Sequence, residues 1–126
     1  MTDRDDALRA LRPVLELPPA TQPAERFQNQ TLRPLLKLQN PLLLAAMRQY
    51  LLARKAPLTR LPPPEQRAYL AHALRTDQKL KNRLVGLVLG LLTLEEYAQF
   101  VADEAELTRR LTELLIQRFQ DQLDQL

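Results

Sequence analysis

The feature that most restricts the fold of this chain is an apolar run from Leu84 to Leu92, which contains both glycines of the protein, Gly86 and Gly90. No polar side chain interrupts the run, so a helix through it has no hydrophilic face and belongs in the middle of a helical bundle. The run is about half the roughly 20 residues that span a bilayer. We therefore expect a central buried helix and no membrane segment.

Gly86 and Gly90 are four residues apart, so they share one face of this helix and let another backbone approach closely. Two interpretations are open. The glycine face packs against another helix of the same chain, or it forms an interface for self-association or a groove for a ligand. Lys79 and Arg83 fall on the same side of the helix.

The composition favours an all-α fold. Thirty of the 126 residues are leucine and tryptophan is absent, while the β-branched residues that strands prefer are scarce. The length fits one domain with a real core. We expect a single compact bundle of six or seven helices with the glycine-containing helix at its centre. Residues 1–23 form a short helix and a proline-rich arm, and residues 24–126 form the bundle domain.

Capping residues and prolines predict where the helices begin and end. Thr2 caps a short helix that ends near Leu11, and four prolines make residues 12–23 extended. Pro34 kinks or interrupts a helix over 23–38, and Asn40 caps another that runs to Lys55. Beyond a loop at 56–63, the remaining helices open at Pro64, at Asp77 or Thr76, at Thr93 and at Asp103. Two of these starts, Thr93 with Glu96 and Asp103 with Glu106, have the spacing of a capping box.

The net charge of +3 conceals a strong segregation of charge along the chain. Residues 1–25 carry three arginines against five acids, a net charge of −2. Residues 26–91 carry twelve Lys/Arg against two acids, a net charge of +10, and residues 92–126 carry three arginines against eight acids, a net charge of −5. The basic middle segment either attracts a polyanion such as nucleic acid or is neutralised by the acidic C-terminal helices of this chain or a sister subunit.

A polar stripe on the second helix offers the residue types that hold a phosphate or a carboxylate. The candidate anion-binding residues are Arg26, Asn29, Arg33 and Lys37 on that helix, with Lys79 and Arg83 at the mouth of the glycine face. The same stripe also fits the wet side of an amphipathic helix. Tyr50 and Tyr69 are the aromatic candidates for stacking on bases in the basic segment.

Few residues suit catalysis or metal binding. The chain has no cysteine and a single histidine, His72, so the usual zinc ligand sets are missing. His72 with Asp77 or Glu65 has the composition of an acid–base pair, but a structural role fits a histidine on an amphipathic helix better. We expect no metal, no cofactor and no catalytic residues, and the opening residues, which are charged and lack an apolar core, favour a cytoplasmic protein.

Two stretches, FQNQTLRPLLKLQNPLLL at 27–44 and LVGLVLGLLTLEEY at 84–97, carry a resemblance. Together they are similar to a small all-helical bacterial family whose members often carry the label "glyoxalase". That label implies isomerisation of methylglyoxal conjugates on a metal held by His and Glu residues in paired βαβββ modules. This sequence lacks the strands and the histidines, and it also lacks the HxHxDH motif of the hydrolase type. The resemblance therefore implies the fold and no ligand residues.

These observations give three functional hypotheses. The first is a non-enzymatic interaction protein that self-associates through the glycine face or the acidic C-terminal helix. The second is a protein that binds nucleic acid or another polyanion through its basic segment. The third, a metal-dependent enzyme of glyoxalase type, has the least support in the sequence.

Overall fold

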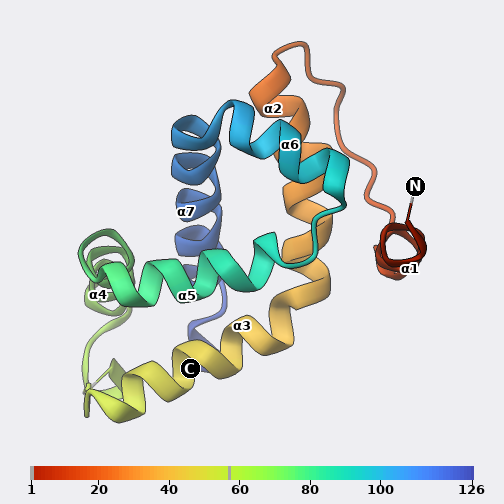
Figure 1. Ribbon diagram of the computed structural model, residues 1–126. Helices are drawn as coiled ribbons and strands as arrows, with labels where there is room; N and C mark the ends of the chain where they lie inside the picture. Colours follow the sequence, from red (N-terminus) through yellow and green to blue (C-terminus); the bar gives the residue numbers. More distant parts are fainter. Residues whose placement is uncertain (1, 57) are drawn as a thin grey trace.

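The computed structural model describes residues 2–56 and 58–126, and this part of the chain is helical without a strand (Figure 1). The expected all-α bundle is confirmed. The α-helices are α1 (Asp3–Leu11), α2 (Pro23–Phe27), α3 (Arg33–Ala53), α4 (Pro63–Thr76), α5 (Gln78–Leu89), α6 (Leu94–Ala102) and α7 (Glu104–Gln120). Because α2 continues through a π-helical turn at Gln28–Leu32 into α3, the described residues contain six separate helical rods.

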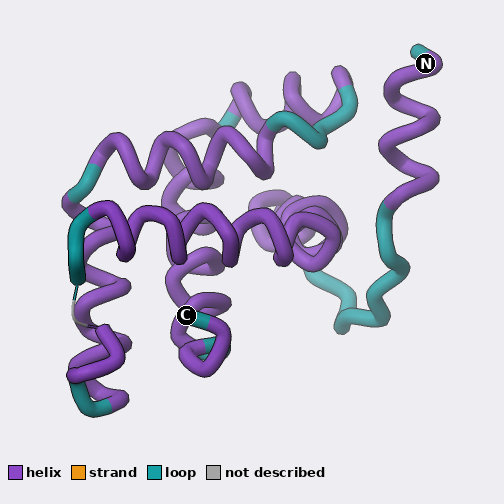
Figure 2. Tube along the Cα trace, turned by 90° about the horizontal axis from the view of Figure 1, so that it is seen from below, coloured by secondary structure: helices purple, strands orange, loops and turns teal. Residues whose placement is uncertain are grey.

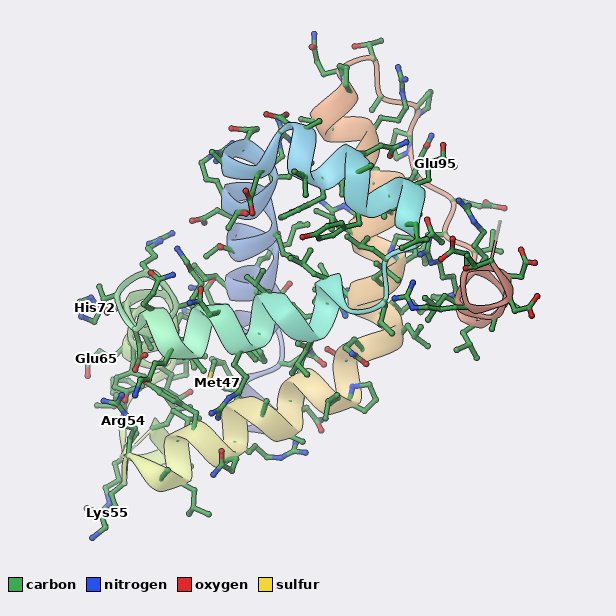
Figure 3. The ribbon with its side chains drawn as sticks, in the orientation of Figure 1. Met47, Arg54, Lys55, Glu65, His72 and Glu95 are labelled. Carbon is green, nitrogen blue, oxygen red and sulfur yellow. The ribbon has the colours of Figure 1, made fainter. Side chains whose placement is uncertain are left out.

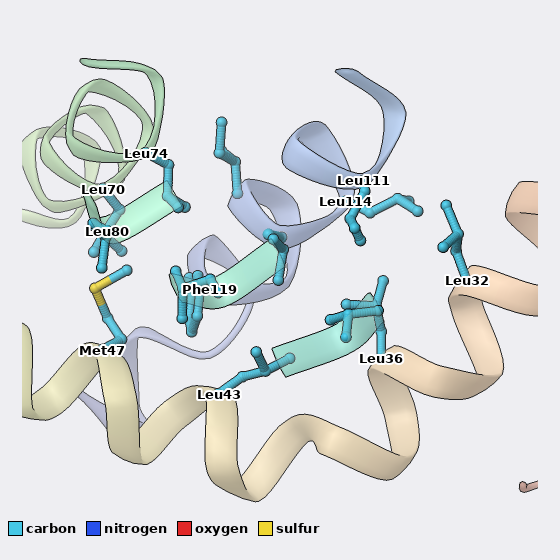
Figure 4. Close-up of a cluster of buried hydrophobic side chains, with 14 of the residues drawn as sticks. Leu32, Leu36, Leu43, Met47, Leu70, Leu74, Leu80, Leu111, Leu114 and Phe119 are labelled. Carbon is cyan, nitrogen blue, oxygen red and sulfur yellow. The ribbon is translucent and has the colours of Figure 1, made fainter. Parts of the chain in front are cut away.

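The core is a leucine-rich cluster between α3, α4, α5 and α7 (Figure 4). Each helix contributes side chains spaced three or four residues apart, which is the pattern of a helix buried on one face. The fully buried members include Leu36, Leu43 and Met47 of α3, Leu70 and Leu74 of α4, Leu84 and Val88 of α5, and Leu111, Leu115 and Phe119 of α7. Burial of one such side chain stabilises the fold by roughly 1.5–3 kcal/mol.

The rod from Pro23 to Ala53 differs from the two helices that its prolines predict. Asn40 does not cap a new helix, because Pro41 lies inside α3. Figure 1 shows α3 changing direction along its length, which is what a proline without an amide hydrogen produces. The π-turn ends just before Pro34, and the Arg33 amide donates to Gln28 O. This wider turn replaces the interruption expected at Pro34, since a proline ring clashes with the carbonyl four residues earlier in a regular α-helix.

Three of the predicted helix caps are confirmed. Thr2 accepts from the Asp5 amide, and Asp77 accepts from the Leu80 amide at 3.1 Å. Thr93 and Glu96 form the complete capping box, with reciprocal bonds of 3.2 and 2.9 Å. The second box is wrong. Asp103 makes no capping bond with its side chain, and the Glu106 carboxylate pairs with Arg109 and Arg110 instead of reaching back to the Asp103 amide.

The N-terminal arm keeps α1 apart from the other helices (Figure 2), and α1 reaches the bundle through polar contacts. Arg4 donates to the carbonyls of Gly90 and Leu92, both at 3.0 Å, where α5 ends. Asp5 accepts from the Leu94 amide at the start of α6. α1 therefore places a cation, Arg4, at the C-terminal end of α5 and an anion, Asp5, at the N-terminal end of α6, as the helix dipoles favour.

Among the described residues, no other helix packs against the glycine face of α5. Gly86 and Gly90 are both exposed, and a Cβ added to Gly86 would meet nothing within 4 Å. The helix is buried only where Leu80, Leu84 and Val88 meet α3, α4 and α7. The expectation of a helix enclosed on all sides is therefore wrong, because its neighbours cover one side only.

The connection between α3 and α4 contains a short 3₁₀ turn at Leu58–Arg60, and α4 begins at Pro63, one residue earlier than expected. Pro57, which belongs to the predicted loop at 56–63, lies outside the described residues. Within the described residues, no helix is both long and apolar enough to cross a membrane.

Candidate anion-binding surface

Most cations of the basic segment have no acidic partner in the described part of the chain. Of its twelve Lys/Arg, only Arg54 and Arg75 form salt bridges, Arg54 with Asp77 and Arg75 with Glu113. Glu95 and Glu96 pair with the N-terminal arm, and Glu106 pairs within α7. Neutralisation of the basic segment by the C-terminal helices of the same chain is therefore limited to one ion pair.

Seven of the ten basic-segment cations without a salt bridge among the described residues lie in residues 48–83, which comprise the second part of α3, the 3₁₀ turn, α4 and the start of α5. This segment, which we call the basic end, carries nine Lys/Arg against Glu65 and Asp77, a net charge of +7. Figure 3 shows Arg54, Lys55 and His72 at one extreme of the molecule and Glu95 far from them. A surface with this excess of one sign attracts anions from solution.

A hollow of about 540 Å³ opens in the basic end between α3, α4 and α5. It brings together side chains from three elements that the sequence separates by up to 29 positions. Its polar lining consists of Tyr50, Arg54, Tyr69, His72, Thr76, Asp77, Gln78 and Lys79. The two tyrosines considered for base stacking therefore share one hollow with Lys79, a predicted anion-binding residue.

Asp77 fixes one wall of this hollow. Its carboxylate accepts from the Leu80 amide, from Tyr50 Oη at 3.0 Å and from Arg54 Nη2 at 2.6 Å. The Arg54 guanidinium also lies over the Tyr50 ring, 5.1 Å from its centroid, in cation–π geometry. The Leu80 hydrogen bond, helped by Tyr50 and Arg54, holds the pKa of Asp77 below its usual range.

The same contacts set the protonation of Tyr50. Burial raises the pKa of the Tyr50 hydroxyl, and the hydrogen bond to Asp77 and its negative charge raise that pKa further. Tyr50 is therefore a neutral donor to an ionised Asp77 at neutral pH. The polar groups of Tyr50, Arg54 and Asp77 therefore bond mainly to one another, and this wall has little capacity to bind a ligand.

Three side chains of the hollow remain free to bind. In the described part of the chain, the side chains of Tyr69, His72 and Lys79 have no hydrogen-bond or salt-bridge partner. Tyr69 supplies a half-buried aromatic ring and His72 an imidazole, both on α4, and Lys79 supplies an ammonium group on α5. A ring beside a cation is the combination that single-stranded nucleic acids bind, through base stacking and phosphate contact.

The six predicted anion-binding residues do not form one site. Arg26 and Asn29 line a separate hollow of about 440 Å³ with Arg9 and Arg12 of the arm. Arg33 lines a third hollow with Arg118, and Lys37 is exposed on α3. Lys79 and Arg83 lie one turn apart on the exposed side of α5, together with Gly86 and Gly90.

His72 and Arg118 line these hollows with free or largely free side chains, but the candidate set from the sequence omitted them. Tyr50 and Tyr69, in contrast, could be recognised as candidates from the sequence, because they are aromatic residues within a basic segment. Arg118 carried no such signal, since it approaches Arg33 only through the packing of α7 on the start of the α3 rod. In the described residues, no group of three or more His, Asp or Glu side chains is placed to hold a metal ion.

In comparisons with protein-family models, curated proteins and solved structures, nothing matches this chain. The resemblance carried by residues 27–44 and 84–97 therefore stays a prediction.

Proposed function

We propose that this protein binds a polyanion, with single-stranded nucleic acid as the class of partner, through the basic end. The observation that carries the proposal is that seven of the nine cations in residues 48–83 have no salt-bridge partner among the described residues. Such cations can displace condensed counterions from a phosphate backbone, which is the main source of affinity for nucleic acids.

The Tyr69 hollow supports single strands over duplexes. A base in a single strand is free to leave its neighbours and stack on an aromatic ring. Tyr69 is half-buried and lines the hollow beside His72 and Lys79. A phosphate next to the stacked base would meet Lys79, and the next cation along the same face of α5 is Arg83.

The test is fluorescence anisotropy with a labelled single-stranded RNA of mixed sequence at low salt. We expect the double variant Lys79→Gln/Arg83→Gln to bind at least about tenfold more weakly than the wild type, because two phosphate contacts are lost. The matched control is Arg9→Gln/Arg109→Gln, which changes the net charge equally but lies outside the basic end. It should alter affinity by less than about threefold, since only distant charge is removed.

Stacking is tested separately at Tyr69. Tyr69→Ala should weaken RNA binding by roughly 5- to 100-fold, whereas Tyr69→Phe should retain it, because stacking needs the ring and not the hydroxyl. No binding of mixed RNA or DNA at about 50 mM salt would remove the proposal. Equal losses in both charge variants would also contradict it.

A second proposal, self-association, is favoured by the outer face of α6. Leu94, Tyr97 and Val101 are 60%, 53% and 49% exposed and follow one another at helical spacing. The adjoining face of the same helix is already buried through Phe100 and the ion-paired Glu96. An exposed apolar stripe beside a buried face is a surface suited to a protein partner.

Sedimentation equilibrium tests self-association. We expect a dimer that Tyr97→Glu converts to monomer, because a charge in an apolar contact is costly. The matched control is Leu52→Glu at an apolar residue that is 80% exposed on α3, outside α6. A strict monomer at high concentration, or equal effects of the two variants, contradicts self-association through α6.

A further inference from the structure

A hollow of about 280 Å³ lies between the start of α3 and the end of α7, outside the basic end. Two arginines, Arg33 and Arg118, line it from opposite helices, with Leu36 and Leu114 as its apolar wall. Both arginines are only partly exposed, and neither forms a salt bridge with a described residue. Two like charges held together without a carboxylate between them are an arrangement that an anion would stabilise.

The neighbouring amides hold both guanidinium groups and leave most of their donors free. Arg33 Nε donates to Asn29 Oδ1 at 3.0 Å, which leaves both Nη groups of Arg33 available. Arg118 Nη1 lies 3.5 Å from Asn40 Oδ1. The Asn40 amide is itself fixed by a reciprocal pair of hydrogen bonds with Gln122, of 2.8 and 2.9 Å. The free guanidinium donors therefore belong to arginines that are positioned by the amides of Asn29 and Asn40.

The electrostatics of the hollow agree with this geometry. Burial and the positive charge of Arg33 lower the pKa of Arg118, while the negative charge of Asp121 opposes the effect. Asp121 also lines the hollow, but its carboxylate is exposed and forms no salt bridge with either arginine. One carboxylate at the rim leaves the pair with an unneutralised positive charge.

We propose that the hollow between Arg33 and Arg118 is a binding site for a phosphate-type oxyanion. Arginine is the residue that matches such an anion, because its planar fork donates two parallel hydrogen bonds to two oxygens. Two forks from opposite helices, with the Gln117 amide also lining the hollow, offer several donors to one tetrahedral group. The Gln122 amide adds none, because it already donates to Asn40 Oδ1 and to Arg118 O. The site does not rest on the proposed function, because neither arginine belongs to the basic end.

The phosphate group has two sources, a free ion or an ester on a small molecule. The hollow is open on one side to solvent, so its shape admits either source. Isothermal titration with inorganic phosphate and, separately, with adenosine monophosphate distinguishes them at constant ionic strength in chloride. Tighter binding of the ester indicates a phosphorylated molecule, and tighter binding of the inorganic ion indicates free phosphate.

Four variants test the site with inorganic phosphate. Arg33→Gln and Arg118→Gln should each weaken binding by at least about tenfold, because each removes charged hydrogen bonds to the anion. Arg118→Lys, which keeps the charge and loses the fork, should weaken it less. Asp121→Asn should tighten binding, since it removes the one opposing charge. Arg109→Gln, on the exposed face of the same helix, is the matched control and should bind as the wild type does.

Circular dichroism melting of each variant shows whether the fold is retained, and Arg118→Lys keeps the test decisive if Arg118→Gln unfolds. The absence of saturable binding of phosphate and of adenosine monophosphate to the folded wild type would overturn the site. Wild-type affinity in both arginine-to-glutamine variants would overturn it as well. The Lys79→Gln/Arg83→Gln variant should bind phosphate normally, which separates a failure of this site from a failure of polyanion binding.

Discussion

Glu96 joins the start of α6 to the N-terminal arm. Its side chain is only 8% exposed, caps the start of α6 with Thr93 and accepts from both Nη groups of Arg12 in the arm. Burial raises the pKa of Glu96, but the hydrogen bonds from Arg12 and from the Thr93 amide outweigh burial and lower it to about 2. The Thr93–Glu96 spacing predicts the capping box, whereas the partner Arg12, 84 positions away, leaves no local signal.

The low pKa of Glu96 predicts a specific loss of stability in acid. The folded value is about 2 and the unfolded value about 4.5, so the ionised pair contributes stability that is fully present above pH 4.5 and is lost as the pH falls towards 2. The loss amounts to roughly 3 kcal/mol at most. Urea unfolding of the wild type and of Glu96→Gln at several pH values measures it.

The variant should show a flatter dependence of the unfolding free energy on pH below 5 than the wild type. Glu95→Gln is the neighbouring control, because Glu95 is 73% exposed and lies 4.0 Å from Arg9. Exposed pairs of this kind contribute little. The same acid dependence in wild type and Glu96→Gln would contradict the account of Glu96.

At the scale of elements, α5 combines a buried leucine face with an exposed glycine face. Gly86 and Gly90 face solvent, so the space left by their missing side chains is not used for packing within the described residues. Glycine in a helix interior costs about 1 kcal/mol relative to alanine. The two positions differ in the space available to a methyl group, and this difference yields a matched pair of substitutions.

Gly86→Ala should stabilise the protein by up to about 1 kcal/mol, because the new Cβ meets nothing within 4 Å. Gly90→Ala should give less or nothing, since its Cβ would lie 3.3 Å from Gly86 O at the end of the helix. Thermal unfolding of both variants checks the order. A destabilising Gly86→Ala would contradict an exposed glycine face and would indicate that another backbone covers it.

The helices were predictable where local chemistry decides them. The caps Thr2, Asp77 and Thr93 and the buried spacing of α7 follow from residues within one or two turns. The rod through Pro34 and Pro41 was not predictable in this way. Its continuity depends on Leu32, Leu35, Leu36 and Leu43, whose burial against other helices outweighs the local preference of the prolines to end a helix.

At the scale of the whole molecule, the charge segregation along the chain becomes a segregation in space. The acids of α6 pair with the arginines of the N-terminal arm, and the basic end keeps its excess charge. The total charge of the basic segment could be read from the sequence, but its lack of partners could not. Which carboxylate reaches which cation is decided by the docking of α1 and α7, through contacts between residues far apart in sequence.

The candidate sites show the same limit. Lys79 and Arg83 were predictable as one exposed face, because they are four residues apart on one helix. The gathering of Tyr50, Tyr69 and His72 around Lys79 needs the crossing of three helices, and the approach of Arg118 to Arg33 needs the packing of the last helix on the first long one. The residue types in the sequence therefore predicted anion binding, but they did not show which residues would lie together in one site.

The salt dependence of nucleic-acid binding tests the central claim, an unpaired basic end, most directly. Affinity for a single-stranded oligonucleotide should fall with a slope of log K against log salt of roughly −0.7 per phosphate neutralised, or about −3 to −5 if most of the free cations take part. The slope should be shallower by about 1.4 in Lys79→Gln/Arg83→Gln, because two phosphate contacts are lost. A slope near zero in the wild type, or the same slope in wild type and variant, would contradict the claim.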